Sequence, residues 1–267
     1  GLGFDPGYIQ GRDELEAVDN VEFIADFYSE KYSDHKGDFV CCKMTLEHIP
    51  DTADFIDQVG HAIDIDRETT VFFQVPDSMR ILTECAFEDI YYEHCSYFSP
   101  HSLSRLFHGY GLEILDVSTE YDDQYLTIEA KAIKGDSRSP LKHNGEADAL
   151  TQLVESFAER YRARTAKWQQ ILDDCARDGK KVVLWGSGSK GVAFLTSLDR
   201  EDMIKFVVDI NPYRQGHYMV GFGQKIVSPE FLQEYQPDLV IVMNRIYTDE
   251  IRSMLDELSL EPEIRAL

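Results

Sequence analysis

Short apolar runs alternate with segments of helical spacing along the first half of the chain. The β-branched and aromatic residues 70–76 predict a strand, and residues 38–43 are typical of a buried strand. Between them, residues 54–63 carry apolar side chains three and four positions apart, which predicts a helix. The whole pattern predicts strands at 21–27, 38–43, 70–76, 112–120 and 124–132, and helices at 11–17, 54–63 and 101–109.

This order of elements predicts an α/β fold. Strands and helices alternate and then end in two consecutive strands, 112–120 and 124–132, which are joined through Asp122 and Asp123. A doubly wound sheet with a reversed edge strand accounts for both features.

The second half contains a long amphipathic helix and a second α/β domain. The polar, turn-rich residues 135–140 predict a domain boundary, and residues 145–178 predict the helix. A strand, a Gly-x-Gly-x-x-Gly turn at 186–191 and another helix follow, and the next strand ends at Asp209. We therefore divide the chain into domains at 1–134 and 179–267, with residues 135–178 as linker and long helix.

Charge and cysteine usage restrict the partners and the compartment. The 267 residues carry a formal net charge of −23, so nucleic acid and anionic membranes are not expected partners. No apolar run approaches the ~18 residues needed to span a bilayer. The five cysteines include no Cys-x-x-Cys pair, so we expect no metal site within this chain, reduced thiols and a cytoplasmic location.

Residues 90–100 concentrate the candidate chemistry. They combine Tyr91, Glu93, His94 and Tyr97 with further aromatic and hydroxyl side chains. Such a mixture suits the wall of a half-open pocket, because buried polar groups need partners. Histidine titrates near neutral pH, and tyrosine hydroxyls can donate to an oxygen that gains negative charge. A surface loop with ordinary hydrogen bonds is the alternative interpretation.

The glycine turn permits two interpretations. A strand, Gly186-x-Gly188-x-x-Gly191, a helix and the acid Asp209 form a moderately specific dinucleotide fingerprint. The alternative is a turn in which the glycines serve only the packing of helix on sheet.

Residues 91–99 resemble the "YxEHxSYFS" signature of the S-adenosylmethionine-dependent sugar C-methyltransferases. The turn 46–51 is similar to the "LEHIPDP" turn of such domains. The segments at 185–191, 208–216, 227–230 and 237–244 resemble the family's "WGxGSKG", "VDxNPxKxG", "VSPE" and "PDxVIVMN" elements. The resemblance implies an incomplete class I methyltransferase (Rossmann-like) domain, joined by a long helix to a second Rossmann-like α/β domain. The family's first strand and glycine loop, and its Cys-rich zinc module, are expected upstream of residue 1, so the chain is expected to be amino-terminally truncated.

The resemblance also implies roles for individual residues. The substrate would be a nucleoside-diphosphate 4-keto-deoxysugar, whose C3 proton is removed by His94 as general base. Glu93 would orient His94 or hold the sugar, and Tyr91 would stabilise the enolate. The remaining assignments are S-adenosylmethionine binding by Asp5, Glu47 and His48, and sugar-nucleotide binding by Tyr97, Ser96, Ser187, Lys190 and Asn244.

Two other functions remain open at this point. One is an NAD-dependent sugar-nucleotide oxidoreductase or epimerase that uses the turn at Gly186. Such an enzyme would carry a Tyr-x-x-x-Lys pair and would have its glycine motif near the amino end. The other is a non-catalytic module that binds a nucleotide sugar. The sugar, the nucleotide, the ring carbon, the pathway and the oligomeric state are not indicated by the sequence.

Overall fold

A computed structural model of the chain describes residues 1–11, 20–66, 68–132, 145–199 and 201–267. The predicted helix at 11–17 and the predicted boundary at 135–140 fall largely or wholly outside these residues. The chain divides into two compact units. The first contains Gly1–Val75, Pro100–Ser118 and Thr127–Lys142, and the second contains Pro76–Ser99, Thr119–Leu126 and His143–Leu267. The division into domains at 134 and 178 stays a prediction.

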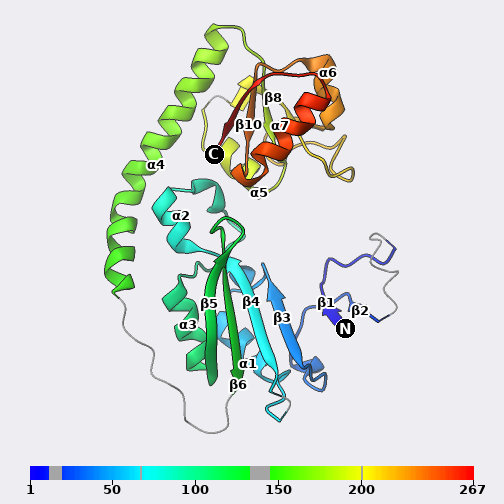
Figure 1. The fold of residues 1–267 in the computed structure, drawn as a ribbon, viewed down its shortest axis with the longest axis vertical. Coiled ribbons are helices and arrows are strands. Elements are labelled where there is room, and N and C mark those ends of the chain that lie inside the picture. Colours follow the sequence, from blue (N-terminus) through cyan, green and yellow to red (C-terminus); the bar gives the residue numbers. More distant parts are fainter. Residues whose placement is uncertain (12–19, 67, 133–144, 200) are drawn as a thin grey trace. The chain divides into compact units, whose positions relative to one another are not determined.

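Two sheets are formed in the first half of the sequence. Strands β1 (Leu2–Phe4) and β2 (Glu22–Ile24) pair in parallel. Four further strands form a sheet in the order β3-β4-β6-β5, in which β3 and β4 are parallel (Figure 1). Their bounds are β3 Phe39–Lys43, β4 Thr70–Pro76, β5 Leu112–Glu120 and β6 Tyr125–Ala132. The neighbours β5 and β6 are joined by residues 121–124, so they form the predicted hairpin.

The core of this four-stranded sheet is aromatic. Alternate residues of β4, including Val71 and Phe73, are fully buried, as expected for a strand with one face on the core. The ring of Phe73 meets that of Phe107 edge-to-face at a centroid distance of 5.0 Å. Phe107 belongs to α3 (Pro100–Gly109), which confirms the predicted helix. The other helix, α1, spans Thr52–Gly60 and so begins two residues earlier than predicted.

Two expectations for this region were incomplete. Strand β3 is not buried, because it lies at the end of the sheet order, and its Phe39 side chain is 58% exposed. The sequence pattern also missed helix α2 (Ser78–Glu84). Its cap is formed by Asp77, whose carboxylate accepts hydrogen bonds from the backbone N–H groups of Met79 (2.9 Å) and Arg80 (3.2 Å).

The carboxy-terminal sheet has a doubly wound topology. Its five strands are all parallel, in the order β11-β10-β7-β8-β9. The chain proceeds outward from β7 through β8 to β9, and then from β10 to β11 on the other side. The bounds are β7 Val182–Trp185, β8 Ile204–Val208, β9 Lys225–Val227, β10 Leu239–Val242 and β11 Glu263–Ala266.

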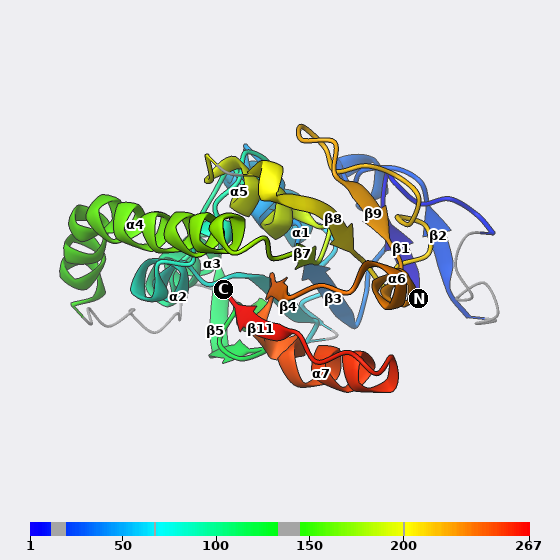
Figure 2. The ribbon, with the colours of Figure 1, turned by 90° about the horizontal axis from the view of Figure 1, so that it is seen from above.

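Helices cover both faces of this sheet. Helix α5 (Ser189–Thr196) and helix α7 (Thr248–Glu257) lie on opposite faces (Figure 2), and α6 (Leu232–Tyr235) lies on the α7 side. Alternate residues of β7 therefore enter different cores: Leu184 packs with α5, and Trp185 packs with α7. This confirms the second Rossmann-like α/β domain.

The long helix is confirmed as α4 (Glu146–Arg177). Its residues Trp168 and Leu172 are buried in the same core as Phe194 of α5, and the Trp168 and Phe194 rings meet edge-to-face at 5.4 Å. Two arginines of α4 donate to backbone carbonyls at the end of α2: Arg160 to Thr83 (3.1 Å) and Arg164 to Glu84 (2.6 Å). Helix α4 thus ties α2 to the carboxy-terminal sheet.

Candidate functional site

The segment 90–99, here named the His94 loop, brings three predicted site residues together. The imidazole of His94 lies 4.1 Å from the ring of Tyr91 and 5.7 Å from that of Tyr97, centroid to centroid. His94 is 7% exposed, so this contact removes most of the ring from solvent. Burial raises the pKa of the Tyr97 phenol, so this side chain stays a neutral hydrogen-bond donor at physiological pH.

The His94 loop is fixed at both ends. Before it, the short 3₁₀ helix η4 (Phe87–Asp89) ends in two buried carboxylic residues, Glu88 and Asp89. After it, the carbonyl of Phe98 accepts a hydrogen bond from Ser78 N at 2.9 Å, and the Ser99 hydroxyl bonds with the Glu146 carboxylate. Within the loop, His94 N donates to the carbonyl of Tyr91 at 3.2 Å. The position of the imidazole is therefore set by a short, tied segment.

Other residues of the loop are more open. Glu93 is exposed and Ser96 is partly exposed. Tyr92 is 99% exposed. The structure thus groups Tyr91 and Tyr97 around His94, whereas the roles of Glu93 and Ser96 stay predictions.

The predicted cofactor residues Asp5, Glu47 and His48 belong to the first unit. Asp5 directly follows β1, and its Oδ1 accepts a hydrogen bond from Gly7 N at 2.7 Å. Glu47 and His48 lie in η3 (Leu46–His48), after β3, where Glu47 is 1% exposed and His48 is exposed.

The Glu47 carboxylate is a buried acceptor group that lacks donors. Neither of its oxygens has a hydrogen-bond partner among the described residues, and its Oε1 lies 4.0 Å from His48 Nε2. Burial raises its pKa. A buried carboxylate of this kind is costly unless a ligand supplies donors. Asp5 and Glu47 each offer carboxylate oxygens, which are acceptors for hydroxyl and ammonium donors.

Two glycines of the Gly-x-Gly-x-x-Gly turn serve the packing of this fold. Gly186 has a φ of +115°, a conformation that favours glycine. A Cβ on Gly191 would lie 2.5 Å from the carbonyl oxygen of Gly186, so only glycine lets α5 approach the turn. Gly188 has an ordinary φ of −77°, and the nearest group to a Cβ there would be the Arg214 guanidinium at 3.6 Å.

Predicted contact Ser187 and the acid Asp209 bind each other. The Ser187 hydroxyl and backbone N–H both bond with Asp209 Oδ2, the latter at 3.0 Å, and Arg214 lies 3.3 Å from the same oxygen. Burial alone would raise the pKa of Asp209, but the hydrogen bonds from Ser187 and Asn211 and the charge of Arg214 lower it. Both oxygens of the Asp209 carboxylate are therefore engaged within the protein, Oδ2 by Ser187 and Arg214 and Oδ1 by Asn211 N.

Lys190 and Asn244 meet residues that the sequence analysis did not select. The Lys190 ammonium donates to Asp89 Oδ2 (2.9 Å) and to Gln124 Oε1 (3.0 Å), and the Gln124 amide donates to Asn244 Oδ1 (3.0 Å). Lys190 follows β7 and Asn244 follows β10, at the point where the strand order reverses and doubly wound folds bind ligands. Asp89 and Gln124 belong to no sequence motif that the analysis recognised, because only the fold brings them next to Lys190.

A Tyr-x-x-x-Lys spacing does occur near the amino end, at Tyr32 and Lys36. The Tyr32 hydroxyl donates to Asp26 Oδ2 at 2.7 Å, and Lys36 donates to the carbonyl of His61. The Tyr32 hydroxyl and the Lys36 ammonium therefore bond to different residues.

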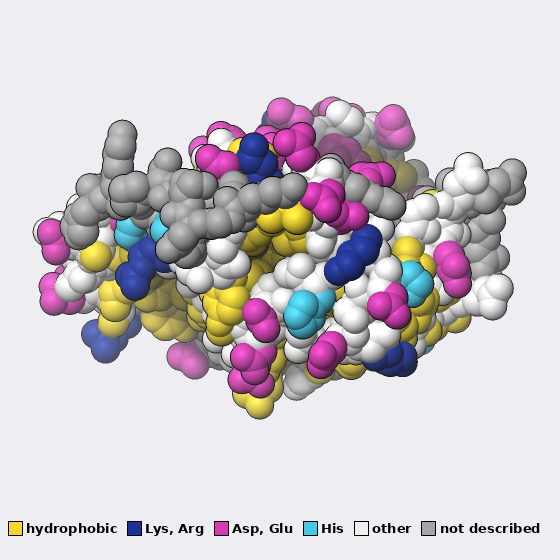
Figure 3. All heavy atoms as spheres, turned by 90° about the horizontal axis from the view of Figure 1, so that it is seen from below, with side chains coloured by type: hydrophobic (Ala, Val, Ile, Leu, Met, Phe, Trp, Pro, Cys, Tyr) yellow, Lys and Arg dark blue, Asp and Glu magenta, His cyan; other side chains and the backbone are white. Residues whose placement is uncertain are grey.

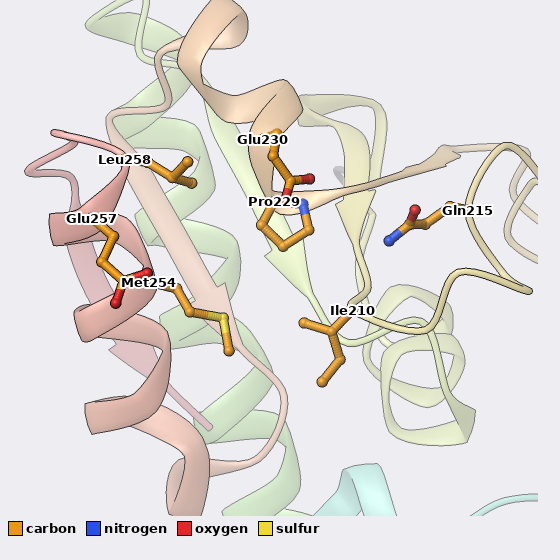
Figure 4. Close-up of a pocket in the computed structure, with 7 residues that line it drawn as sticks. All are labelled: Ile210, Gln215, Pro229, Glu230, Met254, Glu257 and Leu258. Atoms are coloured by element: carbon orange, nitrogen blue, oxygen red, sulfur yellow. The ribbon is translucent and has the colours of Figure 1, made fainter. Parts of the chain in front are cut away.

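A pocket of about 340 Å³ lies beside the carboxyl ends of β8 and β9 (Figure 4). Helix α7 and the residue after it form one wall, and residues after β8 form the other. It is lined by Ile210, Gln215, Pro229, Glu230, Met254, Glu257 and Leu258. None of these residues was predicted from the sequence as a site residue, and the carboxylates of Glu230 and Glu257 make it unsuited to an anion.

The surface agrees with the acidic composition. On the face shown in Figure 3, acidic side chains are widespread and the basic ones lie apart from one another. Within the part of the chain that the structure describes, no helix combines the length and apolarity that crossing a bilayer requires.

Two family models match separate parts of the chain. Residues 1–117 match the family model "Methyltransferase domain", and residues 141–261 match "C-methyltransferase C-terminal domain". A curated relative, the C-methyltransferase NovU of Streptomyces niveus, is 28% identical over 219 residues, which make up 78% of this chain and 51% of that protein. The chain therefore spans about half the length of this relative.

Two solved methyltransferases show weak structural likeness. Magnesium protoporphyrin IX methyltransferase from Synechocystis PCC 6803, determined with bound SAH, has a TM-score of 0.34 and 11% identity, covering 45% of this chain and 56% of that one. The 16S rRNA (adenine(1408)-N(1))-methyltransferase from Catenulisporales acidiphilia has a TM-score of 0.38 and 15% identity, covering 51% and 74%. Likeness at these scores carries no argument about function. By the two family models and the curated relative, this chain is similar to proteins in which a methyltransferase domain is followed by a C-methyltransferase C-terminal domain.

Proposed function

We propose that this chain is part of an S-adenosylmethionine-dependent C-methyltransferase that acts on a nucleoside-diphosphate 4-keto-deoxysugar. The single observation that carries the proposal is the placement of His94. A buried imidazole held between two tyrosine rings on a tied loop is suited to take a proton from a carbon acid.

The chain's own residues supply the proton chemistry. His94 removes the C3 proton of the sugar, whose acidity comes from the neighbouring ketone, and the bonding electrons pass into the enolate. The Tyr91 hydroxyl donates to the oxygen that becomes negative. Tyr97 closes the other side of His94, and Glu93 and Ser96 contact the sugar from the exposed part of the loop.

The cofactor would be held by the first unit. Asp5 accepts from ribose hydroxyls, and Glu47, with His48 beside it, offers the acceptors that are otherwise unsatisfied. When bound, S-adenosylmethionine supplies an electrophilic methyl group. The reaction would take place in the cytoplasm, and the acidic surface supports a small-molecule rather than a nucleic-acid substrate.

The carboxy-terminal domain would bind the nucleotide of the sugar. An NAD-dependent reaction is the less favoured candidate, because Asp209 is bonded to Ser187. Where the strand order reverses, Lys190 donates to Gln124, and Gln124 donates to Asn244. A binding module without chemistry would leave the grouping of His94 and two tyrosines unexplained.

The direct test is methyl transfer to nucleoside-diphosphate 4-keto-deoxysugars, followed by mass spectrometry of the sugar. The expected product carries one additional methyl group on carbon, and His94→Asn abolishes its formation while sugar-nucleotide binding persists. Transfer that proceeds undiminished in His94→Asn would remove His94 from the mechanism.

A further inference from the structure

We propose that the ion pair between Lys190 and Asp89 positions the His94 loop, which makes Lys190 a positioning residue rather than a contact to the sugar nucleotide. The proposal rests on the proposed function, in which His94 must be held in place. It replaces the role that the resemblance implied for Lys190.

The pair is nearly enclosed and lies at the start of the loop. Asp89 is the last residue of η4, two positions before Tyr91. Its Oδ2 accepts from Lys190 Nζ at 2.9 Å and from Arg80 Nη1 at 2.5 Å, and these side chains are 11%, 19% and 8% exposed respectively. Charge-assisted hydrogen bonds in such surroundings are strong and directional. One carboxylate oxygen thus links η4 to helices α2 and α5.

Helix α2 holds both ends of the loop. Arg80 binds Asp89 before the loop, and the backbone N–H of Ser78 binds the carbonyl of Phe98 after it. An isolated bridge also pairs Asp77 with Phe98. Arg80 provides one side-chain attachment of Asp89 at the entry to the loop. Lys190 supplies a second attachment from the first turn of α5.

The ammonium of Lys190 is engaged by the protein itself. Besides Asp89, it donates to Gln124 Oε1, so two of its three N–H donors are directed at protein oxygens. Gln124 is 2% exposed and is held in turn by Asn244. A phosphate that took more than the third donor would displace one of these bonds, and loss of the bond to Asp89 would leave that carboxylate with Arg80.

Amide hydrogen exchange, read by mass spectrometry on the substrate-free chain, tests the proposal without depending on activity. We expect residues 91–97 to exchange about tenfold faster in Lys190→Met and in Asp89→Asn than in the parent chain, with α7 unchanged. The double variant should exchange no faster than Asp89→Asn, since Asp89→Asn already removes the ion pair that Lys190→Met removes. The matched control is Lys205→Met, which removes an exposed lysine of β8 and should change nothing.

Unchanged exchange of residues 91–97 in folded Lys190→Met would overturn the proposal. If Lys190→Met does not fold, Lys190→Gln takes its place, because glutamine keeps a donor for Asp89. Amide exchange of residues 91–97 that is faster than in the parent chain but less than tenfold faster supports the proposal, and exchange at the parental rate contradicts it. Kinetics separate the two roles of Lys190. A positioning role lowers kcat in both Lys190→Met and Asp89→Asn and leaves KM for the sugar nucleotide within about twofold. Phosphate binding raises KM in Lys190→Met alone. If the chain proves inactive, the exchange result still stands.

Discussion

The imidazole of His94 lies against the phenol ring of Tyr91, with 4.1 Å between centroids and 49° between ring planes. Tyr91 is therefore both a packing partner of His94 and a source of a hydroxyl donor beside it. Replacing the hydroxyl without removing the ring separates these two contributions.

Tyr91→Phe should slow proton removal about 10²-fold, because an enolate oxygen loses one directed donor. Binding of the sugar nucleotide should change little, since the ring still supports His94. The measurement is the rate of C3 proton exchange at saturating sugar. Tyr92→Phe is the control, because its side chain is 99% exposed. Equal rates for Tyr91→Phe and the parent chain would exclude a role for the hydroxyl.

The glycine turn gives a prediction about stability. Gly191→Ala should lower the free energy of unfolding by about 1–3 kcal/mol, because the new Cβ meets the Gly186 carbonyl oxygen. Gly188→Ala has room for its Cβ and should stay within about 0.5 kcal/mol. Urea unfolding of the two variants makes the comparison. A stable Gly188→Ala that fails to bind the sugar nucleotide would show that this glycine serves a phosphate.

The Glu88 carboxyl should make stability depend on pH. Glu88 is 2% exposed, and its Oε2 has no hydrogen-bond partner among the described residues. Burial raises its folded-state pKa above the unfolded value. The folded chain then keeps a proton that the unfolded chain has lost, so stability falls as pH rises from about 4.5 through the raised pKa.

Glu88→Gln removes this dependence. The melting temperature of Glu88→Gln should exceed that of the parent chain by more at pH 8 than at pH 5. At pH 8 the free energy of unfolding should be higher by about 1–3 kcal/mol. Glu234→Gln, at an exposed position, is the matched control. If the difference in melting temperature between Glu88→Gln and the parent chain does not grow with pH, ionisation of Glu88 does not destabilise the folded chain.

The regular elements were predictable where the hydrophobic pattern was long. Strands β4 and β5 have the predicted bounds, and α4 differs by one residue at each end. Helix α2 was missed because its seven residues have only one clear signal, the capping Asp77. The prediction that β3 is buried was wrong, because hydrophobicity alone does not indicate which strand lies at the edge of a sheet.

The candidate site was predictable only as far as it is local in sequence. The grouping of Tyr91, His94 and Tyr97 follows from one short segment. The partners of Lys190 do not, since Asp89 and Gln124 are separated from it by 101 and 66 positions. Pairs at such separations depend on the fold and leave no local pattern.

The proposed function and the NAD-dependent alternative make opposite predictions for the binding of NADH. We expect no saturable binding up to about 1 mM in a fluorescence titration. The reason is that Asp209 is held by Ser187 and Arg214. Micromolar binding that disappears in Asp209→Asn would instead support an oxidoreductase.

The central claim is that His94 removes the sugar's C3 proton, and deuterium exchange tests it without a methyl donor. The chain is incubated in D₂O with a nucleoside-diphosphate 4-keto-deoxysugar, and deuterium at C3 is followed by NMR. We predict incorporation by the parent chain and a loss of at least about 10²-fold in His94→Asn, with sugar binding retained. Incorporation at the parental rate in His94→Asn would contradict the account.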